Sequence, residues 1–528
     1  MNSRRLLFAC LAVLSLLVAA CSSASSGSGS AANSGSSGSV QLGGTLVAAR
    51  AADAITWDPA VINENDSLWA AQQVEGTLIK VTPNGKGLQP YIAQSWTISS
   101  NGLVYTFHLN PQAKFCNGQQ ITSADVVYSF TRETAKNAIV SWQFPAGMTM
   151  AAPDPQTVVL TLKQPEAAFA SFLTLWGTAI VSKAYGEQVG SSGLATKPLG
   201  SGPFCLTSWQ KGSQINLVRN KYFWLKDSQG RKLPYLNAIT WKIISDDNAR
   251  VLALESGQVQ VITPAPAAQF SQLTSMSGIV ATKGELLGAL NLFVNTKKSC
   301  LSSVNVRQAL NYALSEQPLI NTVLFGQGTY LGNPLFNANW STNQYGYHYD
   351  LAKAKQLMAS SSCSSGFSTT AIYQAGDTEA QQTLTILKSD WASIGVQLSL
   401  EPLETGTLYA DENDGNFDMY WNLGTNDIYD PAENLHYEML PTSADGSDAG
   451  FTGWSNPQVT SMVLQAESAM NNTERASLYN QIQKIYVTQG PLIYLYTPDN
   501  LWATTNKVHG FSEFPTGAQD FMYTWLSS

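Results

Sequence analysis

The chain has 528 residues, of which 12% are charged and 10% are aromatic, and its formal net charge at pH 7 is −8. A mildly acidic chain without basic clusters argues against nucleic acid as a partner. The length is too great for one typical domain and suits two or three large lobes.

Residues 1–20 have the pattern of a secretory signal peptide. Met1 to Arg5 is short and basic, and the apolar run from Leu6 to Val18 is too short for a membrane-spanning helix. The run continues into Val18-Ala19-Ala20-Cys21, which resembles a bacterial lipobox. We therefore expect cleavage before Cys21 and a lipid on its thiol that anchors the protein to the outside of the cell membrane. An ordinary signal peptide cleaved at the same bond is the alternative.

Residues 21–40 are expected to form a tether. The stretch from Ser22 to Ser39 is almost entirely Ser, Gly, Ala and Asn, and such a composition buries too little apolar surface to fold. No second long apolar run follows, so we expect nothing else to span the membrane.

Short apolar runs alternate with turn residues in the N-terminal half. Thr45 to Ala48 predicts a strand, and Asn101-Gly102 before the alternating run 103–109 predicts a β-hairpin. Thr122, with Asp125 three residues later, predicts the capped start of a helix.

Helices and strands alternate more regularly in the C-terminal half. Asp350 is predicted to cap a helix over 351–358, and Asp377 or Thr378 a longer helix that Gly395 ends. A strand over 396–400, helix starts at Asn456-Pro457 and Thr473, and an apolar strand over 492–496 complete the pattern. The alternation predicts a mixed α/β region with a central sheet.

The cysteines after Cys21 number four, and an even number in an exported protein predicts two disulfides. Of the three pairings we favour Cys116 with Cys205 and Cys300 with Cys363, each pair within one half of the chain. The alternative is a metal cluster, which needs closely spaced ligands such as CxxC or HExxH. Neither motif occurs, and no two of the four histidines have metal-ligand spacing, so no metal site is predicted.

Several segments in matching order resemble the family 5 extracellular solute-binding proteins, which include the dipeptide, oligopeptide and nickel binding proteins of ABC importers. The resemblance spans nearly the whole chain after residue 40. The segments that carry it are Ile55–Pro59, Val74–Leu78, Gln89–Trp96, Lys114–Phe130, Pro198–Phe204, Arg219–Trp224, Phe293–Thr296 and Val306–Leu310.

This resemblance implies a two-lobed α/β fold of the periplasmic-binding-protein type (type II, large peptide-binding subclass), with a hinge and a ligand cleft between the lobes. Lobe I would comprise residues 41–287, with a subdomain at about 77–195, and lobe II residues 288–498. Residues 499–528 would return to lobe I. The implied function is capture of a small solute, most often a peptide, by hinge closure and delivery to the permease of an ABC importer, without catalysis or cofactor, by a monomer.

The resemblance also implies a binding site. Asp427 falls on the position of an aspartate that pairs with the α-amino group of peptide ligands; a turn-capping role is the alternative. Ligand backbone would be bound like an added strand by segments of both lobes. The matching residues are Leu423, Gly424 and Thr425 in lobe II and Asn63, Glu64 and Asn65 in lobe I.

Other ligands and functions stay open at this point. Trp421 and Trp142 could stack on a sugar or a planar group, although each could equally be core. The same fold could bind an oligosaccharide or a chelated metal, or act as a ligand sensor.

A secreted hydrolase is disfavoured because no GxSxG or HExxH motif occurs. The carboxylates that could act in pairs are interpreted as one face of a solvated loop: Glu401, Glu404, Asp411 and Glu412.

Overall fold

A seven-stranded sheet joins the two ends of the described chain. In spatial order its strands are β12 (Ile279–Gly284), β19 (Asn500–Thr505), β11 (Val261–Thr263), β1 (Thr45–Arg50), β10 (Ala238–Ile243), β9 (Gln214–Arg219) and β8 (Phe204–Gln210). β1 runs parallel to both of its neighbours, and β19 runs antiparallel to β11 and β12. Helices α5 (Asp247–Glu255) and α6 (Ala267–Ser275) share a core with the β11–β12 end. The C-terminal segment therefore folds back beside the N-terminal strand.

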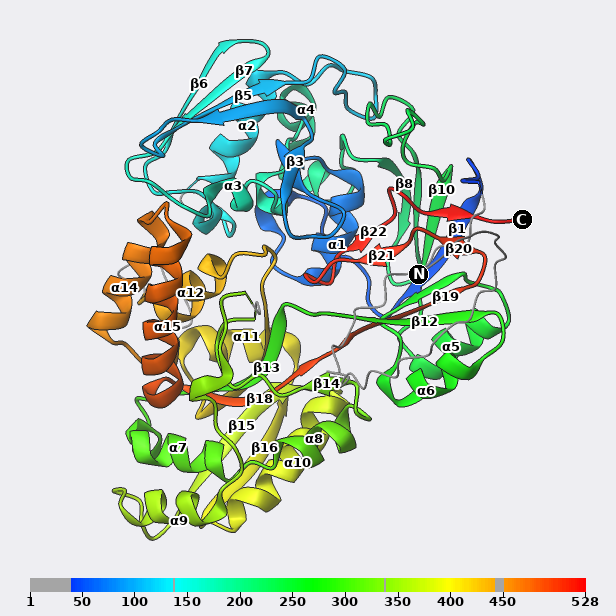
Figure 1. Cartoon of the computed structure of the whole chain (residues 1–528). Helices are drawn as coiled ribbons and strands as arrows, with labels where there is room; N and C mark the ends of the chain where they lie inside the picture. The colour runs from blue at the N-terminus through cyan, green and yellow to red at the C-terminus, as the bar shows by residue number, and fades with distance from the viewer. Residues whose placement is uncertain (1–38, 136–137, 337–338, 442–450) are drawn as a thin grey trace, which may run out of the picture. The chain divides into compact units, whose positions relative to one another are not determined.

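A six-stranded sheet forms the centre of the second lobe. In order its strands are β14 (Gly328–Thr329), β18 (Leu492–Pro498), β13 (Gly288–Val294), β17 (Met419–Thr425), β15 (Phe367–Gln374) and β16 (Val396–Leu403). Every residue of β13 is buried, because helices cover both faces (Figure 1). One face packs on α7 (Val304–Tyr312), α8 (Glu316–Val323), α9 (Leu351–Ala359) and α10 (Thr378–Ala392). The other packs on α11 (Thr405–Asp414), α12 (Ala432–Met439), α14 (Pro457–Ser468) and α15 (Asn472–Gln489).

A four-stranded antiparallel sheet forms a third core in the N-terminal half. Its order is β4 (Ala93–Ile98), β5 (Val104–Leu109), β7 (Thr157–Thr161) and β6 (Thr149–Asp154), and it packs with α2 (Ser123–Glu133) and α3 (Phe169–Phe172). The predicted hairpin is confirmed, with Gly102 at φ 71° in the turn between β4 and β5. The capping box is also confirmed: the Thr122 backbone N–H donates to Asp125 Oδ2 at 2.9 Å.

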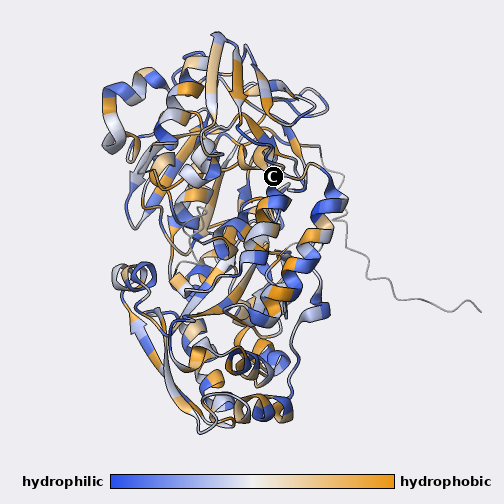
Figure 2. Ribbon diagram, turned by 90° about the vertical axis from the view of Figure 1, so that its left-hand side faces the viewer, coloured by the Kyte–Doolittle hydropathy of each residue, from blue (hydrophilic) through white to orange (hydrophobic). Residues whose placement is uncertain are grey.

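The other α-helices and strands lie outside these three sheets. They are α1 (Asn65–Val74), β2 (Ile79–Val81), β3 (Leu88–Pro90), α4 (Lys183–Leu194), β20 (Val508–His509), β21 (Ser512–Glu513), β22 (Gln519–Asp520) and β23 (Trp525–Leu526). The strands among them pair as β2–β3, β20–β23 and β21–β22. The chain passes from the first sheet to the second between β12 and β13, and returns between β18 and β19. Hydrophobic and hydrophilic residues alternate along most helices and strands (Figure 2), as expected for elements with one buried face.

The computed structural model describes residues 39–135, 138–336, 339–441 and 451–528, and residues 40–528 form one compact unit. The expected signal peptide, Cys21 and nearly all of the tether lie outside the described residues. Within the described ranges, no helix has both the length and the hydrophobicity needed to cross a bilayer, and no group of three or more His, Cys, Asp and Glu side chains could hold a metal ion.

The structure pairs Cys116 with Cys205 and Cys300 with Cys363, the pairing favoured from the sequence. Two expectations were wrong. The four carboxylates predicted to lie on a solvated loop are in regular elements: Glu401 in β16, Glu404 at the N-cap of α11, and Asp411 and Glu412 on α11, which buries Leu408 in the second lobe. Helix α15 begins at Asn472, because Asn471, two residues before the predicted Thr473, is the capping residue that accepts the N–H groups of Thr473 and Glu474.

Candidate ligand-binding site

The main pocket lies between residues of the first and second lobes. It encloses about 950 Å³ of space free of protein atoms, part of it open to solvent. Aromatic and apolar side chains form much of the wall, including Tyr91, Trp176, Tyr429 and Phe514. Four acidic or basic side chains also line it: Glu75, Lys80, Asp427 and Asp520.

Asp427 enters the pocket from the second lobe, in the loop between β17 and α12. Its backbone N–H donates to Glu433 Oε2 at 2.8 Å, and the N–H of Ile428 donates to the same oxygen at 3.1 Å. Oδ1 of Asp427 is shielded from solvent and has no hydrogen-bond partner among the described residues. Burial raises the pKa of this carboxyl to about 7. An ammonium group in the pocket would supply the missing partner.

Glu75 lines the pocket at the end of α1, where its backbone N–H donates to the carbonyl of Ala71. The side chain is buried, and within the described chain Oε2 has no hydrogen-bond partner. Burial and, to a lesser degree, the nearby Asp58 carboxylate raise the pKa of Glu75 to about 8. Asp58 itself is paired with Arg132 at 2.7 Å. Glu75 is therefore mostly uncharged at neutral pH.

Lys80 reaches the pocket from β2. Its Nζ lies 3.5 Å from the sulfur of Met522 and 5.5 Å from the ring centre of Tyr91. Burial lowers the pKa of this amine, and the Asp520 carboxylate raises it in part. The pocket thus contains one cationic group beside its three carboxyl groups.

Lys86 connects the two lobes at the edge of the pocket. Its Nζ lies 5.0 Å from the ring centre of Tyr429 in the second lobe and 3.4 Å from Glu285 Oε2 near the crossing between the sheets. A second contact is the backbone hydrogen bond from Ala167 to the carbonyl of Glu467, at 2.7 Å. The two lobes are therefore in contact at two places, Lys86 with Tyr429 and Ala167 with Glu467.

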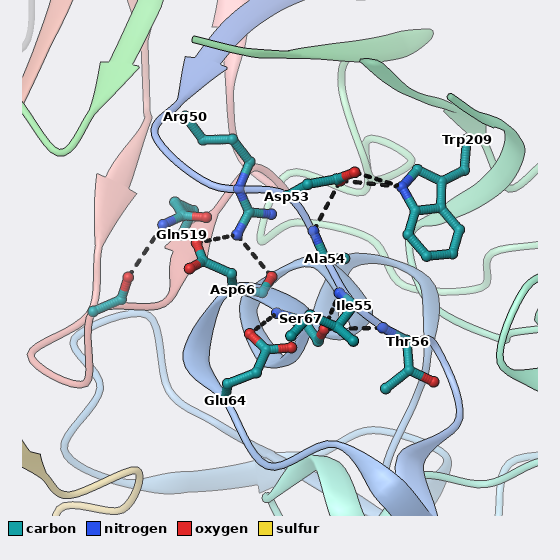
Figure 3. Close-up of polar contacts among 11 residues, drawn as sticks. Arg50, Asp53, Ala54, Ile55, Thr56, Glu64, Asp66, Ser67, Trp209 and Gln519 are labelled. Atoms are coloured by element: carbon teal, nitrogen blue, oxygen red, sulfur yellow. Dashed lines mark hydrogen bonds and ion pairs between the residues drawn. The ribbon is translucent and has the colours of Figure 1, made fainter. Parts of the chain in front are cut away.

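The expected lobe I residues do not line this pocket. Glu64 caps helix α1, with Oε2 accepting the N–H of Ser67 at 2.8 Å, and the neighbouring Asp66 pairs with Arg50 at 2.7 Å (Figure 3). Asn63 is exposed, and Asn65 begins α1. Burial and the nearby carboxylate of Asp66 raise the pKa of Glu64. This segment therefore lies beside the pocket and not in its wall.

The expected lobe II segment extends past its neighbouring strand. β17 pairs with β13 along its full length, from Met419 to Thr425, but with β15 only at Met419 and Tyr420. Leu423, Gly424 and Thr425 are at least partly exposed, and the β15 side of this segment has no strand partner among the described residues. Backbone groups at such an edge can pair with an added strand.

The two tryptophans have different surroundings. Trp421 is 6% exposed and packs in the core of the second lobe against Tyr496, because it shares a face of β17 with Met419. It does not line the pocket. Trp142 is half-buried and contacts the rings of Phe172, Trp176 and, across the lobes, Tyr437. Its ring therefore contacts the pocket wall indirectly, through Trp176.

Most of the pocket was not predicted from the sequence. Glu75 belongs to the segment Val74–Leu78, which resembles family 5, and Lys80 is the one charged residue in the run 77–81. Either residue could have been named as a pocket candidate from the sequence. Tyr429 is two residues from the predicted Asp427. Asp520 and Phe514 are more than 400 residues from Lys80 in sequence, and no local pattern indicates that they meet it.

The family model for bacterial extracellular solute-binding proteins, family 5 (middle region), matches residues 87–446. The chain belongs to this family. Its members are substrate-binding components of transport systems, and the two-lobed architecture with a pocket between the lobes agrees with that membership.

Curated relatives cover nearly the whole of this family 5 chain. Heme-binding protein A of Haemophilus influenzae is 28% identical over 97% of this chain and 97% of its own length. The probable D,D-dipeptide-binding periplasmic protein DdpA of Escherichia coli is 27% identical, with 91% and 94% covered. A solved structure, the periplasmic binding protein DppA of Helicobacter pylori with peptide STSA, superimposes with a TM-score of 0.81 at 27% identity, covering 92% of this chain and 99% of that one.

Proposed function

We propose that this solute-binding protein captures short peptides with a free amino terminus and delivers them to the permease of an ABC importer. The observation that carries the proposal is Asp427: a carboxylate oxygen without a protein partner, shielded from solvent, in a pocket between two lobes. A ligand ammonium would form a charge-assisted hydrogen bond there, which is stronger in a desolvated pocket than in water.

Two further features support a peptide ligand. The unpaired edge at Leu423 to Thr425 can bind an extended backbone as an added strand. Three relatives that align with this chain over most of their length are named as binding proteins for D,D-dipeptides, dipeptides and glutathione. The Helicobacter pylori protein that superimposes on this chain was solved with a bound peptide. Closure of the lobes on the ligand would give the form that the permease recognises.

Isothermal titration calorimetry with alanine peptides and their N-acetylated forms tests the proposal. We expect the free peptides to bind with micromolar or lower Kd, and the acetylated forms at least tenfold more weakly. Asp427→Asn should remove this preference. Asp350→Asn is the matched control, because Asp350 caps α9 far from the pocket and Asn caps equally well. Equal affinity for free and acetylated peptides would contradict the proposal.

We also propose that the mature chain is a monomer attached to the outer face of the cell membrane through a lipid on Cys21. The lipobox-like sequence ending at Cys21 supports the attachment. Expression of the full chain with a labelled fatty acid should label the wild type and not Cys21→Ala. Light scattering of the protein from residue 40 onward should give the monomer mass.

A further inference from the structure

Lys80 has an unusual position for a lysine. The two residues before it in the chain, Leu78 and Ile79, are fully buried, whereas Lys80 is partly exposed and lines the pocket. Lysine ammonium groups are normally at the surface, and burying one is unfavourable unless a partner compensates the lost hydration. The surroundings of this ammonium therefore indicate what it binds.

The protein partners of the Lys80 ammonium are weak. An ammonium has three N–H donors, and within the described residues its one hydrogen-bonded contact is the Met522 sulfur at 3.5 Å, a weak acceptor. The Tyr91 ring adds a cation–π contact at 5.5 Å. Asp520 contributes charge but directs an oxygen to the backbone N–H of Met522 at 2.9 Å. The ammonium therefore retains donors for an oxygen anion from a ligand.

The charges of the pocket also favour an anionic ligand group at Lys80. Lys80 comes from the first lobe and Asp427 from the second, so a ligand between them would meet one positive and one negative group. Two other carboxyl groups line the pocket: Glu75, whose pKa is raised by burial to about 8 and which is mostly neutral at pH 7, and Asp520, which accepts the backbone N–H of Met522 at 2.9 Å. Lys80 and Asp427 thus match the two charged ends of a zwitterion.

We infer that Lys80 binds the carboxylate of the ligand, so that the pocket selects zwitterions, namely short peptides or amino-acid conjugates with both a free amino and a free carboxyl group. This inference rests on the proposed function, in which Asp427 holds the amino group. It assigns specificity for the carboxyl end to the first lobe. If Lys80 merely balanced the charge of Asp520, the ligand's carboxyl group would not matter.

The test compares six ligands by calorimetry at pH 7: di-, tri- and tetra-alanine, each as the free acid and as the C-terminal amide. For the length that binds best, we expect the wild type to bind the acid at least tenfold more tightly than the amide. Lys80→Met should weaken binding of the acid about tenfold or more and leave the amide within about twofold, so that the preference disappears. Lys355→Met, on the exposed face of α9, should behave as the wild type.

Each contrary result has its own meaning. Equal binding of acid and amide by the wild type, or a preference that persists in Lys80→Met, overturns the role of Lys80 and leaves Asp427 unaffected. Binding of none of the six overturns the peptide proposal, and the inference with it. If Lys80→Met unfolds early by circular dichroism, Lys80→Gln replaces it, and the same loss of preference is required.

Discussion

The Glu433 carboxyl accepts the backbone N–H of Asp427 at 2.8 Å, although the two residues belong to different elements. It also accepts the N–H of Ile428, so one side chain on the first turn of α12 fixes the loop after β17. Burial and the proximity of Asp427 raise the pKa of Glu433 well above its usual range. Glu433 therefore acts at neutral pH as an uncharged acceptor that holds Asp427 in the pocket.

Replacement of Glu433 should weaken ligand binding although Glu433 does not line the pocket. Glu433→Ala leaves the partly buried N–H of Asp427 and the buried N–H of Ile428 without an acceptor, at a cost of about 1–3 kcal/mol for the buried group, and should loosen the loop. We expect about tenfold weaker binding of free-amine peptides by calorimetry. Glu433→Gln keeps an uncharged acceptor oxygen and should stay within about threefold of the wild type. Unchanged affinity in Glu433→Ala would show that the loop is held by other contacts.

Ligand affinity should depend on pH through Asp427. Burial raises the pKa of its carboxyl to about 7, and an ammonium ligand favours the charged form. Below pH 7 the carboxyl must lose its proton before it can pair, so affinity should fall by roughly tenfold for each pH unit. Above about pH 8 the ligand's own α-amino group loses its proton. The affinity of a free peptide should therefore be highest between these values.

Titrations at pH 5, 6, 7 and 8 measure this profile. Asp427→Asn should bind weakly and lose the fall in affinity below pH 7. Asp350→Asn should follow the wild type, since its substitution lies on α9 and away from the pocket. A wild-type affinity that does not change from pH 5 to pH 7 would exclude Asp427 as the group that pairs with the amine.

The disulfides should contribute to stability and not to binding. Cys116–Cys205 and Cys300–Cys363 span 89 and 63 residues, and neither lines the pocket. Closing loops of this length restricts the unfolded chain, so replacing both members of either pair by Ser should cost about 2–4 kcal/mol. Urea denaturation followed by tryptophan fluorescence measures the loss, and peptide affinity should stay unchanged. An unaltered urea midpoint would argue against a stabilising role.

Local signals in the sequence predicted local structure well. The box of Thr122 and Asp125 starts α2, Asp350 caps α9, and Asn101-Gly102 forms the β4–β5 turn. Each of these depends on backbone groups within a few residues, so the sequence contains the complete interaction. The loop prediction for the acidic residues near α11 was wrong because it depended on composition alone. The acidic composition suggested a solvent-exposed loop, but Leu408 packs in the core of the second lobe and holds the helix against it.

Pocket residues could be predicted from the sequence only where a single continuous segment contained the recognisable motif. Asp427 could be found because the family motif around it is continuous in sequence, whereas Lys80 and Met522 meet across 442 residues. Trp421 illustrates a signal that was present but not used. Strand alternation from Met419 places Trp421 on the same face of β17, and that face is the core.

Glu75 should make the ligand-free protein less stable as pH rises. Its pKa is raised from 4.5 to about 8 on folding, so between these values the folded state binds a proton that the unfolded state has lost. Stability from this group is therefore complete below about pH 4.5 and is lost as pH rises toward 8. The loss in free energy of unfolding between pH 6 and pH 8 is about 2 kcal/mol at most.

Glu75→Gln should abolish that part of the pH dependence, because the amide does not titrate. Urea denaturation of the wild type, Glu75→Gln and the exposed control Glu187→Gln at pH 6 and pH 8 measures the difference. Parallel behaviour of Glu75→Gln and the wild type would mean that Glu75 is already charged in the empty pocket.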